Sequence, residues 1–266
     1  MSSIFPLHTG TAAALVSPVD DFQSHLSALY TLAQQNNYIF GSPLGPFFHE
    51  GRHAHLPRFV FFGPHASDDS WRLAFLAGYD QRDIRASRAV LHLAERLAGN
   101  VEEGHGLNLT FFPLVDAAGF FLGALPRNLG AEHWGRSAAP EIRLLEKDAR
   151  LRGYHGFIRV ESSRTEDEII VIDVRQPRGT AGSPDLELVS SEETAPYPVR
   201  FECSQLATPV AEGPLAVADD LPFQPFELVL RVPAAWPDEL YHEAVGLILT
   251  RFILRYRAFQ AYGQHL

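Results

Sequence analysis

A histidine and two acidic residues follow a strongly apolar stretch of this chain. The stretch reads Arg58-Phe-Val-Phe-Phe-Gly-Pro, and His65, Asp68 and Asp69 come directly after it, just before a pattern with helical spacing. In α/β proteins, ligands bind where buried strands reach the edge of the sheet at their carboxyl ends. An imidazole beside a carboxylate is suited to metal binding or to acid–base catalysis. The sequence therefore predicts a metal or catalytic site at His65 and Asp68.

Apolar strands and amphipathic helices alternate along the chain, and this order indicates the architecture that must hold the site. Strands are predicted at 38–40, 58–62, 107–115, 156–161, 169–174, 200–203 and 226–232. Helices are predicted at 20–35, at 71–97 with a break near 78–83, at 138–151 and at 238–262. We expect a single α/β domain over residues 1–266, with a mixed, mostly parallel twisted sheet and helices on both faces.

Composition limits the classes of partner. Lys and Arg total 22 against 32 Asp and Glu, and the resulting net charge of −10 argues against nucleic acid as a partner. Cys203 is the single cysteine, so His, Asp and Glu are the available metal ligands. No apolar run approaches the ~18 residues of a membrane span, and the first residues lack the features of a secretory signal. We expect a soluble, cytoplasmic protein with no membrane partner.

Three further stretches follow one another in the middle of the chain. They are Val115-Asp-Ala-Ala-Gly-Phe120, Pro126-Arg127-Asn128-Leu-Gly130-Ala-Glu132 and Ala139-Pro-Glu141, the last of which opens a helix. Their order resembles the zinc carboxypeptidase family related to carboxypeptidase A. In that family, an Asn-Pro-Asp-Gly-Phe-like turn precedes an arginine, a Gly-Val-Asp-x-Asn-Arg segment and a Pro-Glu or Ser-Glu helix start. The stretch from His65 to Asp68 then stands in the place of the family's His-x-x-Glu zinc motif.

The resemblance implies a zinc ion held by two histidines and a glutamate, and this sequence departs from that set. His65 matches the first ligand, Asp68 stands in place of the glutamate, and Glu161 stands in place of the second histidine. Arg127 and Arg231 are the two candidate catalytic positions. Arg127 matches the arginine that polarises the scissile carbonyl and stabilises the oxyanion. Arg231 stands in place of the glutamate that activates the zinc-bound water, and an arginine cannot accept that proton.

Two hypotheses follow, and they differ in cofactor. In the first, His65, Asp68 and Glu161 bind zinc or another divalent metal such as Mn²⁺, Fe²⁺ or Mg²⁺, and the chain is an active metal-dependent carboxypeptidase or amidohydrolase. In the second, Arg231 supplies the counter-charge for the two carboxylates and no metal binds. The chain is then a zinc carboxypeptidase-like protein that has lost hydrolysis and binds a peptide or a small amide-containing ligand. We favour the second because it explains the changes at 161 and 231 together.

Overall fold

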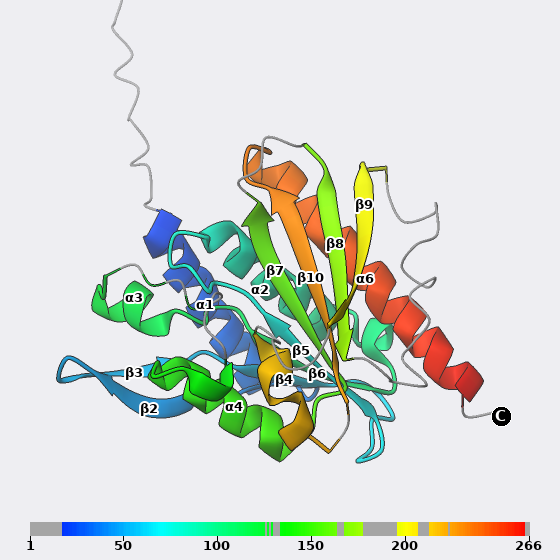
Figure 1. Ribbon diagram of the computed structural model, residues 1–266, viewed down its shortest axis with the longest axis horizontal. Helices are drawn as coiled ribbons and strands as arrows, with labels where there is room; N and C mark the ends of the chain where they lie inside the picture. The colour runs from blue at the N-terminus through cyan, green and yellow to red at the C-terminus, as the bar shows by residue number, and fades with distance from the viewer. Residues whose placement is uncertain are drawn as a thin grey trace, which may run out of the picture.

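One large β-sheet forms the centre of the molecule in the computed structural model (Figure 1). The structure describes residues 18–125, 127, 129, 134–163, 168–177, 196–206, 213–222 and 224–263. The sheet has eight strands, in the order β1, β4, β6, β5, β7, β10, β8, β9. Their bounds are β1 Ile39–Gly41, β4 Phe59–Phe62, β5 Trp71–Leu76, β6 Leu107–Phe112, β7 Gly156–Ser163, β8 Ile170–Pro177, β9 Val199–Leu206 and β10 Phe226–Pro233.

The sheet contains pairings of both directions. The strands β6, β5, β7 and β10 pair in parallel, as do β8 and β9. The pairs β1 with β4, β4 with β6 and β10 with β8 are antiparallel. Parallel pairs therefore outnumber antiparallel pairs by four to three, and the predicted mixed, mostly parallel sheet is confirmed.

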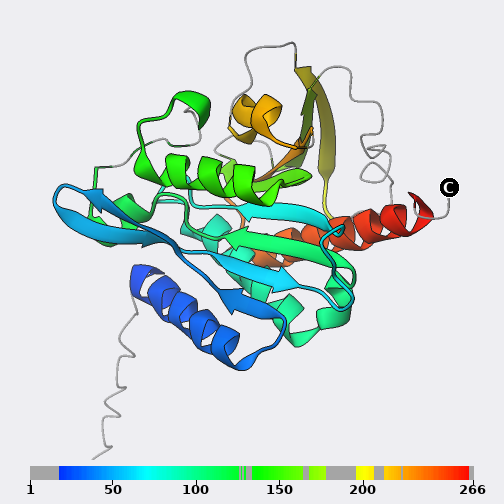
Figure 2. The same cartoon turned by 90° about the horizontal axis from the view of Figure 1, so that it is seen from below.

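Helices cover both faces of the sheet (Figure 2), as predicted. One face carries α1 (Pro18–Gln35), α2 (Ile84–Gly99) and α6 (Asp238–Gly263), and the other carries α4 (Pro140–Arg152) with the short 3₁₀ helices η3 (Trp134–Arg136) and η5 (Pro214–Asp220). Alternate residues of each strand pack against the helices on opposite faces of the sheet, because successive side chains point to opposite faces. On β7, Ile158 and Val160 belong to the core under α2 and α6, whereas Phe157 belongs to the core under α4.

The remaining described elements lie around this sandwich. They are the hairpin of β2 (Leu44–His49) and β3 (Arg52–Leu56), the 3₁₀ helix η1 (Val101–Gly104) and the short helix α3 (Ala117–Leu122). The sequence did not predict the hairpin or α3.

Residues 71–76 correct one prediction. They form the strand β5, between β6 and β7, whereas the sequence predicted that a helix begins at 71. Leu73, Ala74, Phe75 and Leu76 are all fully buried. A run that is apolar at every position fits a strand buried on both faces as well as a buried helix, so periodicity does not separate the two. The helix α2 begins only at Ile84, after the predicted break.

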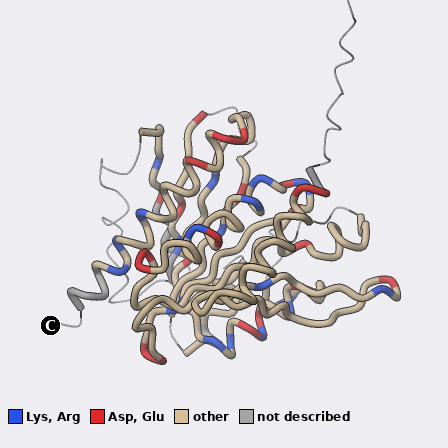
Figure 3. Tube along the Cα trace, turned by 180° about the vertical axis from the view of Figure 1, so that it is seen from behind, with Lys and Arg blue, Asp and Glu red and all other residues tan. Residues whose placement is uncertain are grey.

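Charged residues of both signs occur throughout the described chain (Figure 3). No helix among the described residues is both long and apolar enough to cross a bilayer. Because the two signs are interspersed, the ion pairs between neighbouring side chains determine the electrostatics of each region.

Candidate functional site

The parallel strands β5, β7 and β10 end at the same edge of the sheet, which we call the carboxyl edge. Glu161 of β7 and Arg231 of β10 are directly opposite each other in the register of these two strands. Both point to the face that carries α4 and η5, because Ile158 and Leu230 serve the core on the other face. Ligands of open α/β sheets bind at such an edge.

Six charged side chains on β7, β8 and β10 form a closed ring on this face, with signs that alternate. In order around the ring they are Arg159, Glu161, Arg231, Asp173, Arg175 and Glu227. Each member contacts the next, and the last contacts the first. Three arginines and three carboxylates make the charge ring neutral when all six are ionised.

The deep side of the charge ring is held by two arginines. The Nε atom of Arg159 lies 3.2 Å from Glu161 Oε1 and 3.3 Å from Glu227 Oε1. The Nε atom of Arg175 lies 2.8 Å from Asp173 Oδ2, and its Nη1 atom lies 3.6 Å from Glu227 Oε2. Glu227 therefore has a guanidinium at each of its oxygens.

Arg231 closes the outer side of the charge ring. Its Nε atom lies 3.6 Å from Glu161 Oε2, and its Nη1 atom lies 3.6 Å from Asp173 Oδ2. The side chains of Arg231 and Glu161 are 27% and 29% exposed, so this side faces solvent. Arg231 thus contacts Glu161, one of the two carboxylates that the second hypothesis assigns to it, and its other partner is Asp173 instead of Asp68.

Glu227 is the most deeply buried member of the charge ring, with an exposed fraction of 0%. Burial raises the pKa of its carboxyl, and the nearby charges of Arg159 and Arg175 oppose this rise. The backbone at Gly213 covers the carboxylate: a Cβ atom there would lie 3.2 Å from Glu227 Oε1. The ring of Tyr79 lies beneath the Arg159 guanidinium, 5.6 Å from centroid to Cζ.

The donor set around Glu161 does not fit a catalytic zinc ion. Among the described residues, its two ion-pair partners are Arg159 and Arg231. A guanidinium has no lone pair to donate to a metal, and it repels a cation. At position 161 the site therefore offers a carboxylate flanked by two guanidinium groups, where the resemblance implies an imidazole.

His65 and Asp68 lie at the other edge of the sheet. The strand β4 is antiparallel to β6, so its carboxyl end meets the amino ends of the parallel strands. The backbone N–H of Gly106 just before β6 donates to the carbonyl of Pro64, and the guanidinium of Arg72 donates to the carbonyl of Asp68.

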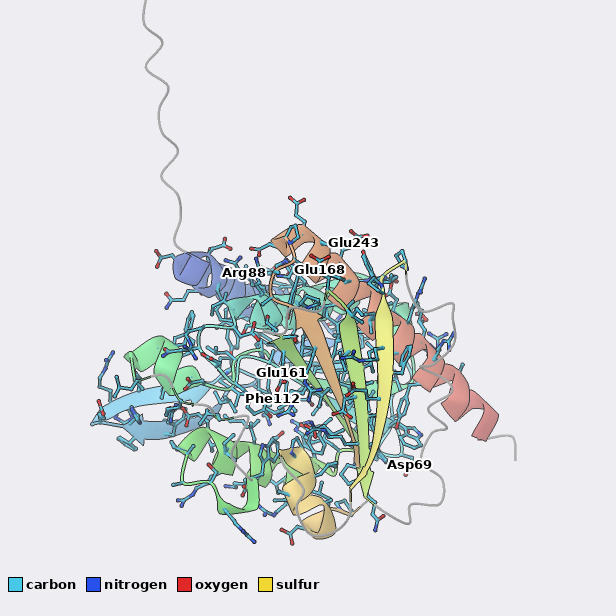
Figure 4. The ribbon with its side chains drawn as sticks, turned by 45° about the horizontal axis from the view of Figure 1, so that its top comes forward. Asp69, Arg88, Phe112, Glu161, Glu168 and Glu243 are labelled. Atoms are coloured by element: carbon cyan, nitrogen blue, oxygen red, sulfur yellow. The ribbon has the colours of Figure 1, made fainter. Side chains whose placement is uncertain are left out.

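The separation between the two edges follows from strand geometry. The N–H of His155 donates to the carbonyl of Arg72, and Glu161 comes six residues later on β7, about 20 Å away at ~3.3 Å per residue. Figure 4 shows the same separation, with Asp69 near the amino ends of the strands and Glu161 near the tip of β7. The structure does not bring His65 and Asp68 together with Glu161.

His65 itself occupies a turn position. Its backbone φ is 60°, in the left-handed region, where histidine is one of the more frequent non-glycine residues. Its ring packs against that of His105, with centroids 4.9 Å apart.

Arg127 lies between two fully buried carboxylates. Its Nη2 atom is 2.5 Å from Asp116 Oδ1 and 2.6 Å from Glu141 Oε1. The carboxylates also accept hydrogen bonds from backbone N–H groups of α3, at Gly119 and Ala118. Burial raises the pKa of Asp116, although Arg127 opposes that rise. The guanidinium of Arg127 thus fastens α3 to the start of α4.

The segment between β5 and α2 contributes residues that the sequence analysis did not select. Asp80 and Asp83 lie there with a spacing of three, at the carboxyl edge. Asp80 pairs with Arg82, at 2.6 Å. Asp83 caps α2 and accepts hydrogen bonds from the Ser162 backbone N–H and hydroxyl, at 2.7 and 2.6 Å. The predicted helix break at 78–83 could have pointed to these residues. A break after an apolar run can also mark the carboxyl end of a buried strand, where ligands bind.

Comparisons of the fold identify its architecture. The metallo-carboxypeptidase of Burkholderia cenocepacia superimposes with a TM-score of 0.67 at 16% identity, over 89% of this chain and 69% of that one. The metallo-carboxypeptidase of Pseudomonas aeruginosa gives 0.58 at 14% identity, over 87% and 67%. Carboxypeptidase A of Helicoverpa armigera gives 0.59 at 11% identity, over 94% and 76%.

The chain therefore has the zinc carboxypeptidase-like fold that the resemblance implied. In sequence, no model of a protein family and no curated protein matches the chain.

Proposed function

We propose that this chain is a carboxypeptidase-fold protein that does not hydrolyse amides and that binds a peptide or a small amide-containing ligand. The observation that carries this proposal is the closed charge ring, in which Arg231 lies against Glu161 at the carboxyl edge. The alternative is a metal-dependent hydrolase that uses His65, Asp68 and Glu161. It would require side chains from two edges of the sheet to meet.

Electrostatics disfavour a divalent ion at Glu161. The charge ring is already neutral, so an added ion would leave two uncompensated positive charges beside its arginines. A divalent cation ~4 Å from one guanidinium is opposed by about 8 kcal/mol at an effective dielectric constant of ~20. One carboxylate that is already shared by Arg159 and Arg231 is a weak source of compensation.

The position that the resemblance assigns to the general base cannot activate a water molecule. Arg231 is protonated at any working pH. Glu227 lies four residues earlier on the same strand, is fully buried, and is held between Arg159 and Arg175. Arg231 therefore cannot accept a proton, and Glu227 is closed off from solvent water.

The exposed side of the charge ring supports binding. Arg231 offers N–H donors and Glu161 offers acceptor oxygens, and both are partly open to solvent. A peptide group has one carbonyl acceptor and one N–H donor, so it can use both side chains.

Hydrolysis and binding can be measured with the same compound. The chain is purified without chelator and incubated with an N-acyl dipeptide, with and without added Zn²⁺, and release of the C-terminal amino acid is followed. We expect no release above that of a Glu161→Gln variant purified in parallel. Isothermal titration calorimetry with the same dipeptide should show binding that weakens by about tenfold or more in Arg231→Gln, because a charged hydrogen-bond donor is lost. Arg200→Gln, an exposed arginine on the neighbouring strand β9, is the matched control and should bind as the unaltered chain does.

Each part of the proposal has its own contrary result. Release that disappears in Glu161→Gln would show that the chain is a hydrolase. Failure of the unaltered chain to bind, or equal binding by Arg231→Gln, would rule out the ligand site.

A further inference from the structure

We propose that His25, His92 and Glu95 form a binding site for Zn²⁺ or a similar divalent transition metal, outside the carboxyl edge. One ligand atom from each residue can be chosen so that all three lie within 4.8 Å of one another. His25 belongs to α1, and the other two belong to α2. The site lies between these two helices, which cover the same face of the sheet (Figure 2).

Local structure explains why the three side chains converge. His92 and Glu95 are three residues apart on α2, so they share one face of that helix. On α1, the neighbours Phe22, Leu26 and Leu29 are buried in the core. This packing brings His25 to the seam between the two helices.

The donor atoms are already close to the spacing of a zinc site. Two ligands of a tetrahedral zinc ion, each about 2.0–2.1 Å from the metal, lie about 3.3 Å apart. His92 Nδ1 is 3.5 Å from Glu95 Oε2, which meets this spacing. His25 Nε2 is 2.6 Å from Glu95 Oε1, a hydrogen-bond distance, and it would lengthen by about 0.7 Å when a metal replaces the shared proton.

Chemistry selects the class of metal. Two imidazoles and one carboxylate suit zinc and its neighbours among the transition metals, whereas Ca²⁺ and Mg²⁺ prefer sets of oxygen donors. The side chain of His92 is 52% exposed, so an ion can enter from solvent and keep water as a further ligand.

A third imidazole lies next to this group. The ring of His242 on α6 has its centroid 5.4 Å from that of His92. The buried Nε2 atom of His242 has no hydrogen-bond partner within the described part of the chain. His242 does not belong to the group of three convergent ligands, but its unpaired nitrogen adds a further imidazole beside that group.

The metal would join two helices that ion pairs already connect. Arg88, labelled in Figure 4 and one turn before His92 on α2, pairs with Asp21 of α1 at 2.6 Å. This ion pair holds the start of α1 without metal. About one turn further along, coordination would replace the contact between His25 and Glu95 by bonds to a shared ion, so the metal should stabilise the folded chain.

Zinc binding to the full chain tests the proposal without reference to hydrolysis. After treatment with chelator and buffer exchange, the chain is titrated with Zn²⁺ by calorimetry, and thermal unfolding is followed with and without Zn²⁺. We expect the chain to bind one equivalent of Zn²⁺ and to unfold at a higher temperature when Zn²⁺ is present. The dissociation constant for Zn²⁺ should be at least about tenfold larger in His25→Ala and in Glu95→Gln. Co²⁺ should give the visible absorption of a nitrogen- and oxygen-ligated ion, and this signal should be lost in both variants.

His65→Ala is the matched control. His65 and His105 also form a close imidazole pair, and His105 Nδ1 lies 3.3 Å from Glu102 Oε2. These residues do not supply three convergent ligand atoms among the described residues. His65→Ala should therefore bind Zn²⁺ as the unaltered chain does. Unchanged affinity in His25→Ala and Glu95→Gln, or no effect of Zn²⁺ on unfolding of the unaltered chain, would show that the group is an ion-pair cluster only. Either result would leave the proposed function at the charge ring untouched.

Discussion

Replacement of Arg159 by methionine tests the energetic importance of the charge ring. Methionine has a similar length but no charge, so Arg159→Met leaves Glu227 with Arg175 as its remaining partner in the ring. Glu227 is fully buried, and neither of its oxygens makes a hydrogen bond within the described part of the chain. Removal of one partner from a buried ion pair costs about 3–5 kcal/mol. The lost contact to Glu161 adds little because that side chain is partly exposed.

Urea unfolding at pH 7 measures this loss in free energy. Arg200→Met is the matched control, because Arg200 pairs with Glu202 at 3.2 Å on the same sheet but the two side chains are 49% and 45% exposed. We expect the control to change stability by less than about 1 kcal/mol. The ion-pair distances are similar in the two cases, so distance alone would predict similar losses in unfolding free energy. The difference in burial predicts a loss that is several fold larger in Arg159→Met than in Arg200→Met.

A double-mutant cycle identifies the charge that is left unpaired. In Arg159→Met with Glu227→Gln, the buried carboxylate is gone, so the double variant should be more stable than the sum of the single changes predicts. The excess should be about 1–3 kcal/mol. The loss in Arg159→Met should also become smaller at acid pH, because burial raises the pKa of Glu227 and the carboxyl can then be neutral. A loss in Arg159→Met below about 1 kcal/mol, or simple additivity with Glu227→Gln, would refute the reasoning.

Three further changes test positions at the two edges of the sheet, mainly by urea unfolding. Asp83→Ala removes the cap of α2 and the acceptor for two hydrogen bonds from β7, and we expect a loss of about 2–4 kcal/mol; a loss below ~0.5 kcal/mol would show that water replaces these bonds. Gly63→Ala should destabilise by more than about 2 kcal/mol, because the new Cβ would lie 1.7 Å from the carbonyl oxygen of Gly104; near-neutral stability would mean that this turn shifts freely. Burial and the charge of Arg72 lower the pKa of His155 from 6.5 to about 4. The unfolded chain therefore takes up this proton first, and stability should fall as pH decreases from 6.5 towards 4; an imidazole NMR titration near 6.5, or an unchanged slope in His155→Gln, would contradict this.

The sheet was largely predictable from the sequence because most of its strands are short apolar runs bounded by turns. The run at 226–232 corresponds to β10, and that at 156–161 to the start of β7. The strand β5 was not predictable in this way, since its residues are buried on both faces and show no period of two.

The direction of β4 explains why the first candidate site did not assemble. An apolar strand that ends in His65 and Asp68 reads the same whether it runs parallel or antiparallel to its neighbour. The pairing of Phe59 with Phe111 and of Phe62 with Asn108 sets the direction, and these contacts join residues about fifty positions apart. Local sequence carries no information on such pairings.

The charge ring was predictable only in part. The resemblance pointed to Glu161 and Arg231, and the register of β7 and β10 places these two residues opposite each other. Asp173 and Arg175 join the ring because β8 runs antiparallel beside β10, and Arg159 joins because it shares a face with Glu161. Which residues belong to the charge ring depends on the register of three strands. The sequence pattern of one strand does not specify that register.

A map of anomalous scattering from crystals soaked in Zn²⁺ tests the central claim most directly. The account predicts that the guanidinium of Arg231 remains against Glu161 and that no zinc peak lies within coordination distance of the Glu161 carboxylate. A peak between His25, His92 and Glu95 is expected in the same map. A zinc ion coordinated by Glu161, with Arg231 displaced, would contradict the account.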